Sequence, residues 1–182
     1  MKTTFAKQKM DAQKLKEFIR DVPDFPKKGI LFKDITPLLK SGPALHFACE
    51  ALAKEFKTLE VEQIVGIESR GFIFSPMIAY KLGTGFIPVR KKGKPPHKVE
   101  RVSYTLEYGE DFLEIHQDAI KPGSRVAIVD DLLATGGTAF AAAHLVEQLG
   151  GKVEKFGFLI ELNFLKGRQK LAPRPVFSLI QY

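Results

Sequence analysis

The residues of this sequence best suited to chemistry lie close together, between Asp130 and Thr138. Two adjacent carboxylates, Asp130 and Asp131, precede a short segment made of Ala134, Thr135, Gly136, Gly137 and Thr138. The paired glycines allow consecutive backbone N–H groups to point into one concavity, and Thr138 can cap a following helix, whose N-terminus attracts anions. Because carboxylates repel a phosphate, we expect their partners to be sugar hydroxyls, a metal ion or both. A phosphate cradle beside an acidic pair predicts a phosphoribosyl site.

Apolar patterning places these residues between a strand and a helix. Residues 126–129 are apolar and mostly β-branched, which suits a strand covered on both faces, and 139–149 suit a helix. Further strands are expected at 64–67, 85–90, 153–162 and 176–180, a hairpin at 104–108 and 112–116 with its turn at 109–111, and helices at 11–22, 43–56 and 74–82. This alternation predicts an α/β fold with a mostly parallel central sheet flanked by helices.

Polar residues follow three of the predicted strands, in the segments 68–71, 90–92 and 130–131. Parallel strands bring their carboxyl ends to one edge of a sheet, and ligands of such sheets bind beyond that edge. The sequence therefore predicts that these three segments form one site.

The composition narrows the class of protein. A chain of 182 residues with 45% hydrophobic and 27% charged residues is most simply one globular domain. No apolar run is long enough to span a membrane and residues 1–9 lack the apolar core of a signal peptide, so we expect a cytoplasmic protein with no membrane partner. The net charge of +7 is concentrated near residues 90–94 without a nucleic-acid-binding motif, which favours a polyanionic small substrate over nucleic acid.

Other nucleotide and metal signatures are missing from the sequence. No Gly-x-x-x-x-Gly-Lys-Ser/Thr occurs, and no Gly-x-Gly-x-x-Gly follows a predicted strand, so kinase and dehydrogenase functions lose their main support. The single cysteine, Cys49, lies on an apolar helical face and is expected to pack there. The four histidines lack metal-ligand spacing, and they are His46, His97, His116 and His144.

The segment 125–138 resembles the phosphoribosyl-pyrophosphate signature of type I phosphoribosyltransferases. Further stretches are similar to the adenine phosphoribosyltransferase family, and these lie at 25–37, 66–72, 88–94, 103–109, 165–173 and 177–182. The resemblance covers nearly the whole chain from about residue 22. It implies the type I phosphoribosyltransferase fold, with a small N-terminal hood at about 22–40 and a flexible catalytic loop at about 91–108. Two departures are mild, because Lys33 stands where many relatives have Arg and Pro95 where many have Leu.

The same resemblance implies a role for each matched residue. The 5′-phosphate would be bound by Ala134, Thr135, Gly136, Gly137 and Thr138, and the ribose hydroxyls by Asp130 and Asp131. Pyrophosphate would be bound by Ser69, in a turn that relatives build with a non-proline cis peptide, and by Arg70, Arg90, Lys91 and Lys94. Adenine would be bound by Leu31, Phe32, Lys33 and Leu132. The catalytic residues would be Glu107, Arg70, Lys91 and Tyr108.

These roles imply a magnesium-dependent transfer of the 5-phosphoribosyl group from phosphoribosyl pyrophosphate to adenine, which gives AMP and pyrophosphate in purine salvage. Mg²⁺ would be held mainly through substrate and water, with no direct protein ligand, and the resemblance implies a homodimer. The loop would close over the substrates and exclude water, while Glu107 would orient adenine near N7 or relay a proton.

Two other functions stay open at this point. One is transfer to another 6-substituted purine, such as hypoxanthine or xanthine, because the backbone contacts that distinguish a 6-amino from a 6-oxo group cannot be read from sequence. The other is a non-catalytic regulator that senses phosphoribosyl pyrophosphate and binds nucleic acid. Against this second function, no DNA-binding module precedes residue 22 and the catalytic loop residues are intact.

Overall fold

A computed structural model of the chain describes residues 10–106 and 109–182. The chain divides into two compact units, Met1–Ala48 and Cys49–Tyr182. Each unit contains one hydrogen-bonded sheet. The elements that begin in the first unit are α1 (Ala12–Leu15), η1 (Lys16–Phe18), β1 (Arg20–Pro23), β2 (Leu31–Asp34), α2 (Thr36–Lys40) and α3 (Gly42–Phe56).

The helix predicted at 11–22 is wrong in its second half. The Asp11 side chain accepts a hydrogen bond from the backbone N–H of Lys14 at 2.9 Å and starts α1, and η1 then ends at Phe18. Residues Arg20–Pro23 pair antiparallel with Leu31–Asp34 instead. A hairpin partner supplies backbone hydrogen bonds that the apolar spacing of one segment does not reveal, and here it overrides the helical pattern.

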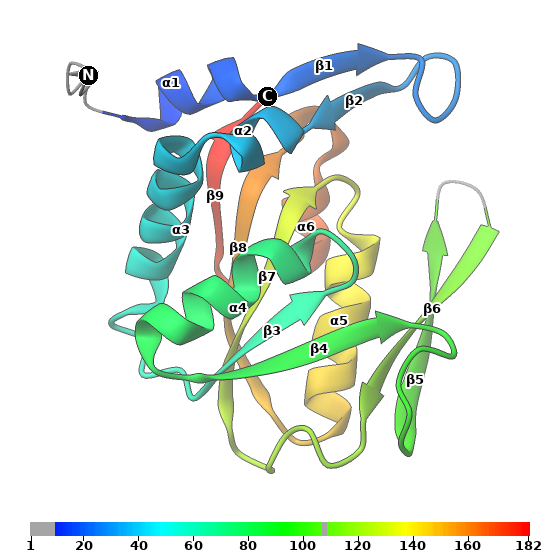
Figure 1. Ribbon diagram of the computed structural model, residues 1–182. Helices are drawn as coiled ribbons and strands as arrows, with labels where there is room; N and C mark the ends of the chain where they lie inside the picture. Colours follow the sequence, from blue (N-terminus) through cyan, green and yellow to red (C-terminus); the bar gives the residue numbers. More distant parts are fainter. Residues whose placement is uncertain (1–9, 107–108) are drawn as a thin grey trace. The chain divides into compact units, whose positions relative to one another are not determined.

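The sheet of the second unit confirms the predicted fold class. Within the described residues its seven strands run in the order β5-β6-β4-β3-β7-β8-β9 (Figure 1). Their bounds are β3 (Gln63–Ile67), β4 (Gly85–Lys91), β5 (Val99–Leu106), β6 (Gly109–His116), β7 (Arg125–Leu133), β8 (Lys152–Glu161) and β9 (Val176–Gln181). Neighbouring strands pair parallel along the run β4-β3-β7-β8-β9, whereas β6 pairs antiparallel with both β4 and β5.

The hairpin of β5 and β6 differs in extent from its prediction. It begins at Val99, inside the segment expected to be a loop, and its last pair is Leu106 opposite Gly109. The turn predicted at 109–111 is wrong, because Asp111 lies within β6 and pairs with Tyr104. Charged residues near a glycine imitate a turn signal, yet here they alternate along a strand.

Helices cover the two faces of this sheet. Figure 1 shows α4 (Gly71–Leu82) and α5 (Gly137–Gln148) on opposite sides of it, which confirms the helices predicted there and begins α4 three residues early. Successive side chains of a strand alternate between faces. Val65 and Ile67 of β3 accordingly join the buried cluster that includes α5, whereas Gly66 abuts Ser75 of α4. In the described part of the chain, no helix is long and apolar enough to cross a membrane.

Candidate functional site

A cavity of about 320 Å³ lies at the carboxyl ends of β3 and β7. Strand β3 has β4 on one side and β7 on the other, so the chain reverses its winding direction there, and ligands bind at such points of open parallel sheets. The lining residues all belong to the second unit, and they are Glu68, Ser69, Arg70, Lys91, Tyr104, Asp111, Asp130, Asp131, Leu132, Leu133, Ala134, Thr135, Gly136, Gly137, Thr138 and Ala139. The convergence of three strand ends predicted from sequence is confirmed.

The segment 134–138 wraps the N-terminus of α5. Gly136 is the N-cap residue with a φ of 80°, and no described side chain caps the helix. The prediction that Thr138 caps it is wrong, because Thr138 lies within the first turn. A left-handed residue at this point needs glycine, and the first-turn N–H groups lack partners within the helix itself. These N–H groups and the helix dipole suit a phosphate.

Two carboxyl groups lie at the end of β7. Asp131 is buried, Asp130 is half-buried, and Asp130 Oδ1 accepts the backbone N–H of Asp131 at 2.9 Å. Burial and the charge of Asp131 raise the pKa of Asp130 well above its usual range. Burial also raises the pKa of Asp131, against the opposing effect of Arg70. Burial therefore favours uptake of a proton by this pair as the pH falls, and the two carboxyls titrate as a unit.

Arg70 connects the end of β3 with this pair. Its Nε lies 2.8 Å from Asp131 Oδ2, close enough for an ion pair, but the geometry falls short of a hydrogen bond and leaves that buried oxygen without a hydrogen-bond partner among the described residues. The peptide bond between Glu68 and Ser69 is cis, as the resemblance implied. Ser69 is exposed beside the cavity.

The basic residues at the end of β4 and just after it make different contacts. Lys91 lines the cavity, where its Nζ lies 3.2 Å from Asp111 Oδ2. Arg90 donates to Glu68 through Nε at 3.3 Å, and Lys94 is exposed. Arg90 and Lys94 do not line the cavity, so of the three predicted pyrophosphate residues in this region only Lys91 is placed there.

Tyr104 and Asp111 line the cavity although sequence reasoning missed them. The Tyr104 hydroxyl donates to Asp111 Oδ2 at 3.2 Å and also bonds to the Thr138 side chain. Burial and the nearby Asp111 raise the pKa of Tyr104 to about 12, so the phenol keeps its proton near neutral pH. The signal that could have found this pair is the alternation of β5 and β6, once Asp111 is assigned to a strand.

The remaining predicted residues belong to the first unit or to the part of the chain that is not described. Leu31, Phe32 and Lys33 belong to β2 of the first unit, where the rings of Phe25 and Phe32 pack edge to face at 5.1 Å. Lys33 is buried and its Nζ donates to Asp21 Oδ1 at 2.7 Å. Glu107 and Tyr108 lie outside the described residues.

The cavity also bears on metal binding. Among residues 10–106 and 109–182, no group of three or more His, Cys, Asp and Glu is arranged to hold a metal ion. Asp130 and Asp131 nevertheless offer carboxylate oxygens, and the buried Oδ2 of Asp131 lacks a hydrogen-bond donor. Mg²⁺ prefers oxygen ligands and is commonly held by one or two carboxylates together with substrate phosphates. The donors present fit a magnesium ion that arrives with its substrate.

Comparisons with known proteins agree on one family. Residues 38–176 match the model of the phosphoribosyl transferase domain. An adenine phosphoribosyltransferase of Solibacter usitatus is 57% identical over 168 residues, which cover 92% of this chain and 97% of that protein. The adenine phosphoribosyltransferase structure from Thermoanaerobacter pseudethanolicus has a TM-score of 0.92 and 53% identity, and covers 94% of this chain and 99% of that one. The enzyme from Saccharomyces cerevisiae, complexed with an imino-altritol bisphosphate and adenine, has a TM-score of 0.87 and 46% identity, covering 92% and 97%.

The raised pKa of Asp130 predicts how the stability of the ligand-free protein depends on pH. A carboxyl whose pKa is higher in the folded state favours folding while protonated, and this contribution is lost as the pH rises. Asp130→Asn cannot ionise and should therefore melt at a higher temperature than the parent at neutral and alkaline pH. The gain should shrink as the pH falls towards about 3.9, the ordinary pKa of aspartate. Thermal unfolding from pH 4 to pH 9 measures this difference.

Asp111 lines the same cavity and provides a control, because its pKa is shifted in the opposite direction from that of Asp130. Burial would raise its pKa, but hydrogen bonds from the Phe112 backbone, Lys91 and Tyr104 lower it overall. A lowered pKa stabilises the folded state above the ordinary value and loses that effect in acid. Asp111→Asn should thus melt at a lower temperature across neutral pH, with the gap closing below about pH 4. Equal pH dependence in the two variants would contradict both assignments.

Proposed function

The chain belongs to the adenine phosphoribosyltransferases, and from this premise we propose how its cavity performs their reaction. The protein transfers the 5-phosphoribosyl group from phosphoribosyl pyrophosphate to adenine and gives AMP and pyrophosphate, a step of purine salvage. The proposal is carried by one observation, a cavity that combines a helix N-terminus, the adjacent carboxyls of Asp130 and Asp131, and two cationic side chains. Each of these groups suits a different part of the substrate.

The sugar phosphate fits between the strand end and the helix. We assign the 5′-phosphate to the N–H groups and threonine hydroxyls of the segment 134–138, where the helix dipole favours an anion. Asp130 and Asp131 then accept hydrogen bonds from the ribose hydroxyls. Hydrogen bonds to a charged carboxylate are stronger than those between neutral groups. Leu132 lies beside them and offers an apolar contact to the base. Contacts of Leu31, Phe32 and Lys33 with adenine stay predictions from the family resemblance.

Arg70 and Lys91 suit the leaving group. Breaking the C1′–O bond puts positive charge on the sugar ring and negative charge on pyrophosphate, so catalysis requires positioned cations and the exclusion of water. Both cations are paired without ligand, Arg70 with Asp131 and Lys91 with Asp111. Pyrophosphate competes for them, and the ribose hydroxyls replace Arg70 as partners of Asp131. Ser69 lies next to Arg70 and donates to the same anion. Arg90 and Lys94 stay predictions at longer range.

Magnesium would offset negative charge of the bound pyrophosphate group. Mg²⁺ would be held mainly by substrate oxygens and water, near the carboxyls of Asp130 and Asp131 but without a direct protein ligand. When bound, this ion supplies Lewis-acid stabilisation of the pyrophosphate oxygens. Asp130 and Asp131 must lose their protons to accept the ribose hydroxyls as carboxylates, and a nearby divalent cation lowers their pKa.

We also propose that Glu107 orients adenine near N7 or relays the proton that leaves N9, with Tyr108 beside it in the same loop. The support is their place in the family resemblance, and in the sequence they lie between β5 and β6, whose Tyr104 and Asp111 line the cavity. Closure of this loop would exclude water from the reacting sugar.

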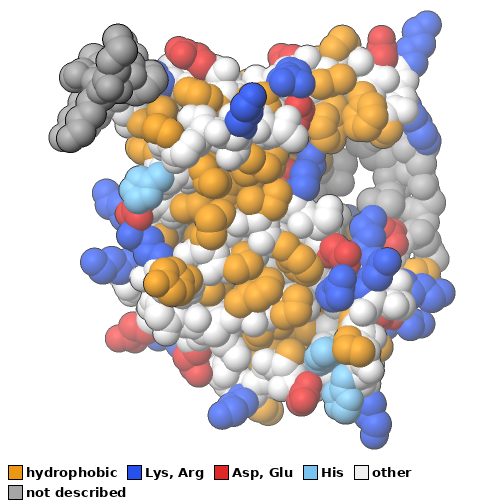
Figure 2. All heavy atoms as spheres, viewed as in Figure 1, with side chains coloured by type: hydrophobic (Ala, Val, Ile, Leu, Met, Phe, Trp, Pro, Cys, Tyr) orange, Lys and Arg blue, Asp and Glu red, His pale blue; other side chains and the backbone are white. Residues whose placement is uncertain are grey.

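A homodimer in the cytoplasm is the proposed setting. Figure 2 shows hydrophobic side chains gathered over α4, and Tyr80 on that helix is 90% exposed. A continuous apolar patch commonly marks an interface between proteins. The cytoplasm follows from the substrates, because highly charged phosphate esters do not cross a bilayer unaided. Light scattering after size-exclusion chromatography measures the oligomeric state.

A product assay tests the function directly. The protein is incubated with phosphoribosyl pyrophosphate, Mg²⁺ and adenine, hypoxanthine, guanine or xanthine, and the nucleotides are separated by chromatography. We expect AMP from adenine, with kcat/KM for the 6-oxo purines lower by about 10⁴-fold, because a site that hydrogen-bonds one edge pattern leaves its groups unpaired with the other. Comparable rates with hypoxanthine would overturn adenine specificity.

Asp131→Asn tests the ribose site. Losing a charged acceptor of hydroxyl hydrogen bonds costs about 1.5–3 kcal/mol, roughly 10- to 100-fold in the dissociation constant of phosphoribosyl pyrophosphate. Adenine affinity should change little. The exposed Asp118 gives the matched control, because Asp118→Asn makes the same change outside the cavity. Unchanged affinity of the Asp131 variant for phosphoribosyl pyrophosphate would remove the proposed role.

Glu107→Ala tests the loop. A group that acts only in the transition state lowers kcat and kcat/KM together. We expect kcat to fall about 100-fold or more, the usual range for general acid–base groups, with little change in the AMP dissociation constant. Glu100 of β5 in the same hairpin bonds to Gln117 at 2.9 Å and serves as the control in Glu100→Ala. A near-normal kcat for Glu107→Ala would exclude the catalytic role.

A further inference from the structure

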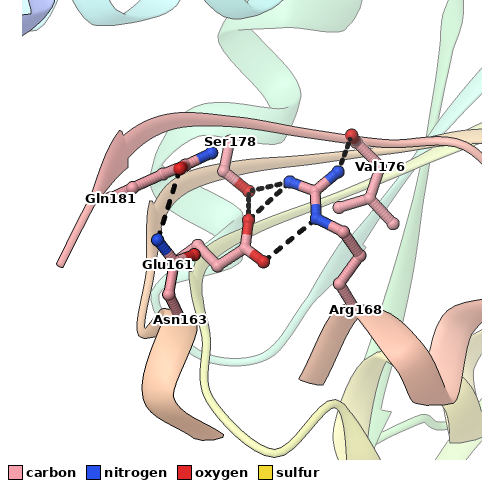
Figure 3. Close-up of polar contacts among 6 residues, drawn as sticks. All are labelled: Glu161, Asn163, Arg168, Val176, Ser178 and Gln181. Carbon is pink, nitrogen blue, oxygen red and sulfur yellow. Dashed lines mark hydrogen bonds and ion pairs between the residues drawn. The ribbon is translucent and has the colours of Figure 1, made fainter. Parts of the chain in front are cut away.

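A polar cluster around the buried carboxylate of Glu161 lies outside the residues assigned to the reaction. Glu161, the last residue of β8, is 4% exposed. Arg168 of α6 (Gly167–Leu171) donates to both its carboxylate oxygens, from Nε at 3.1 Å and from a terminal nitrogen at 2.6 Å. The Ser178 hydroxyl of β9 donates to Glu161 Oε2 at 2.6 Å, and Arg168 also donates to the Val176 carbonyl at 2.6 Å. Figure 3 shows this guanidinium reaching from the helix to both strands.

The cluster fixes a residue that touches the segment 134–138. Gly167 precedes Arg168, and a Cβ built on it would collide with the Ala134 carbonyl oxygen and lie 3.0 Å from the Gly136 nitrogen. A Cβ on Gly136 would in turn lie 2.6 Å from the Gly167 carbonyl oxygen. The backbones of Gly167 and of the segment 134–138 are therefore in direct contact.

The strand that carries Glu161 holds the other end of the same segment. Glu161 pairs with Leu133, the last residue of β7, and the Leu162 backbone N–H donates to the Leu133 carbonyl at 2.9 Å. Residue Ala134 follows directly. The cluster thus reaches the segment through the end of β7 and through Gly167.

Stability alone is a poor explanation for such a cluster. The Arg168 side chain is 44% exposed, and an ion pair that water reaches contributes little to stability by itself. Here hydrogen bonds from Arg168 and Ser178 outweigh burial and lower the pKa of Glu161, so the carboxylate stays charged and tied to both donors. A planar guanidinium with two bonds to one carboxylate fixes direction as well as distance.

We propose that Arg168 and Glu161 are positioning residues for the 5′-phosphate: they hold Gly167 against Ala134 and Gly136, and so keep the N–H groups of the segment 134–138 aimed at the ligand. This inference rests on the proposed placement of the 5′-phosphate at that segment. Neither side chain lines the cavity, so both act through the backbone.

Binding of the two products separates this role from general stability. AMP carries the 5′-phosphate, whereas pyrophosphate with Mg²⁺ occupies only the Arg70 and Lys91 side of the proposed site. A backbone shift of about 1 Å can cost on the order of 100-fold in an enzyme site, and for Arg168→Gln we expect AMP affinity, measured by calorimetry, to fall roughly tenfold or more. Pyrophosphate affinity should stay within about twofold of the parent, a much smaller change than the tenfold loss of AMP affinity, which corresponds to about 1.4 kcal/mol.

Two further variants distinguish position from charge. Arg168→Lys keeps the positive charge but cannot make the two-pronged contact with Glu161, so AMP affinity should recover only in part. Gly167→Ala leaves the cluster intact and pushes on Ala134 and Gly136 directly, so it should weaken AMP in the same selective way. Full recovery in the lysine variant would overturn the proposal, because charge alone would then explain the effect.

Arg125 provides the matched control. It begins β7 at the end of the strand opposite the cavity and pairs with Glu154 and Glu60, each at 3.0 Å. Arg125→Gln removes a similar ion pair and should lower the melting temperature without changing the ratio of AMP to pyrophosphate affinity. If the ratio of AMP to pyrophosphate affinity changes equally in the Arg125 and Arg168 variants, the cluster has only a structural role and the proposal is wrong.

Thr135→Ala tests the premise that the 5′-phosphate binds at the segment 134–138. This change deletes a hydroxyl in the segment and should weaken AMP whether or not the cluster positions the backbone. If Thr135→Ala weakens AMP while Arg168→Gln does not, the positioning role is wrong and the phosphate site stands. If neither changes AMP affinity, the phosphate has been assigned to the wrong segment.

Discussion

The structure depends on keeping two adjacent carboxyls, Asp130 and Asp131, at the end of a central strand. Burial raises the pKa of both, and the ion pair with Arg70 offsets only part of the cost. A polyanion site lined by carboxyls is unfavourable until hydroxyl donors and a cation arrive. In the proposed function, the carboxyls that are costly to bury in the ligand-free cavity therefore favour a ligand that combines a diol, a phosphate and a divalent ion.

Much of this arrangement was predictable from sequence because it is local. The apolar strand before Asp130, the helix after Thr138 and the polar ends of β3 and β4 are each encoded by neighbouring residues, and the parallel topology brings them together. The positive φ of Gly136 was not assigned, because paired glycines do not show which one carries the left-handed angle. The prediction of Thr138 as the cap failed for the same reason.

What the sequence did not predict depends on partners far along the chain. The second half of the helix expected at 11–22 became β1 because β2 pairs with it. Tyr104 and Asp111 entered the cavity because β6 pairs with β4 and β5 in a register that a turn-like composition conceals. Glu161 and Arg168 have no sequence signal, since their contact with the segment 134–138 passes through the backbone of Gly167.

The strand order has a consequence for synthesis of the chain. Asp130 and the segment 134–138 leave the ribosome well before Arg168 and Ser178, which complete the cluster on β8 and β9. Until β8 docks, β7 presents an unpaired apolar edge, and non-local pairing of this kind is slow. A nascent chain therefore carries every residue that we propose to touch the sugar phosphate before the segment 134–138 has its support from Gly167. In this proposal, folding of the C-terminal strands is the step that commits the chain to ligand binding.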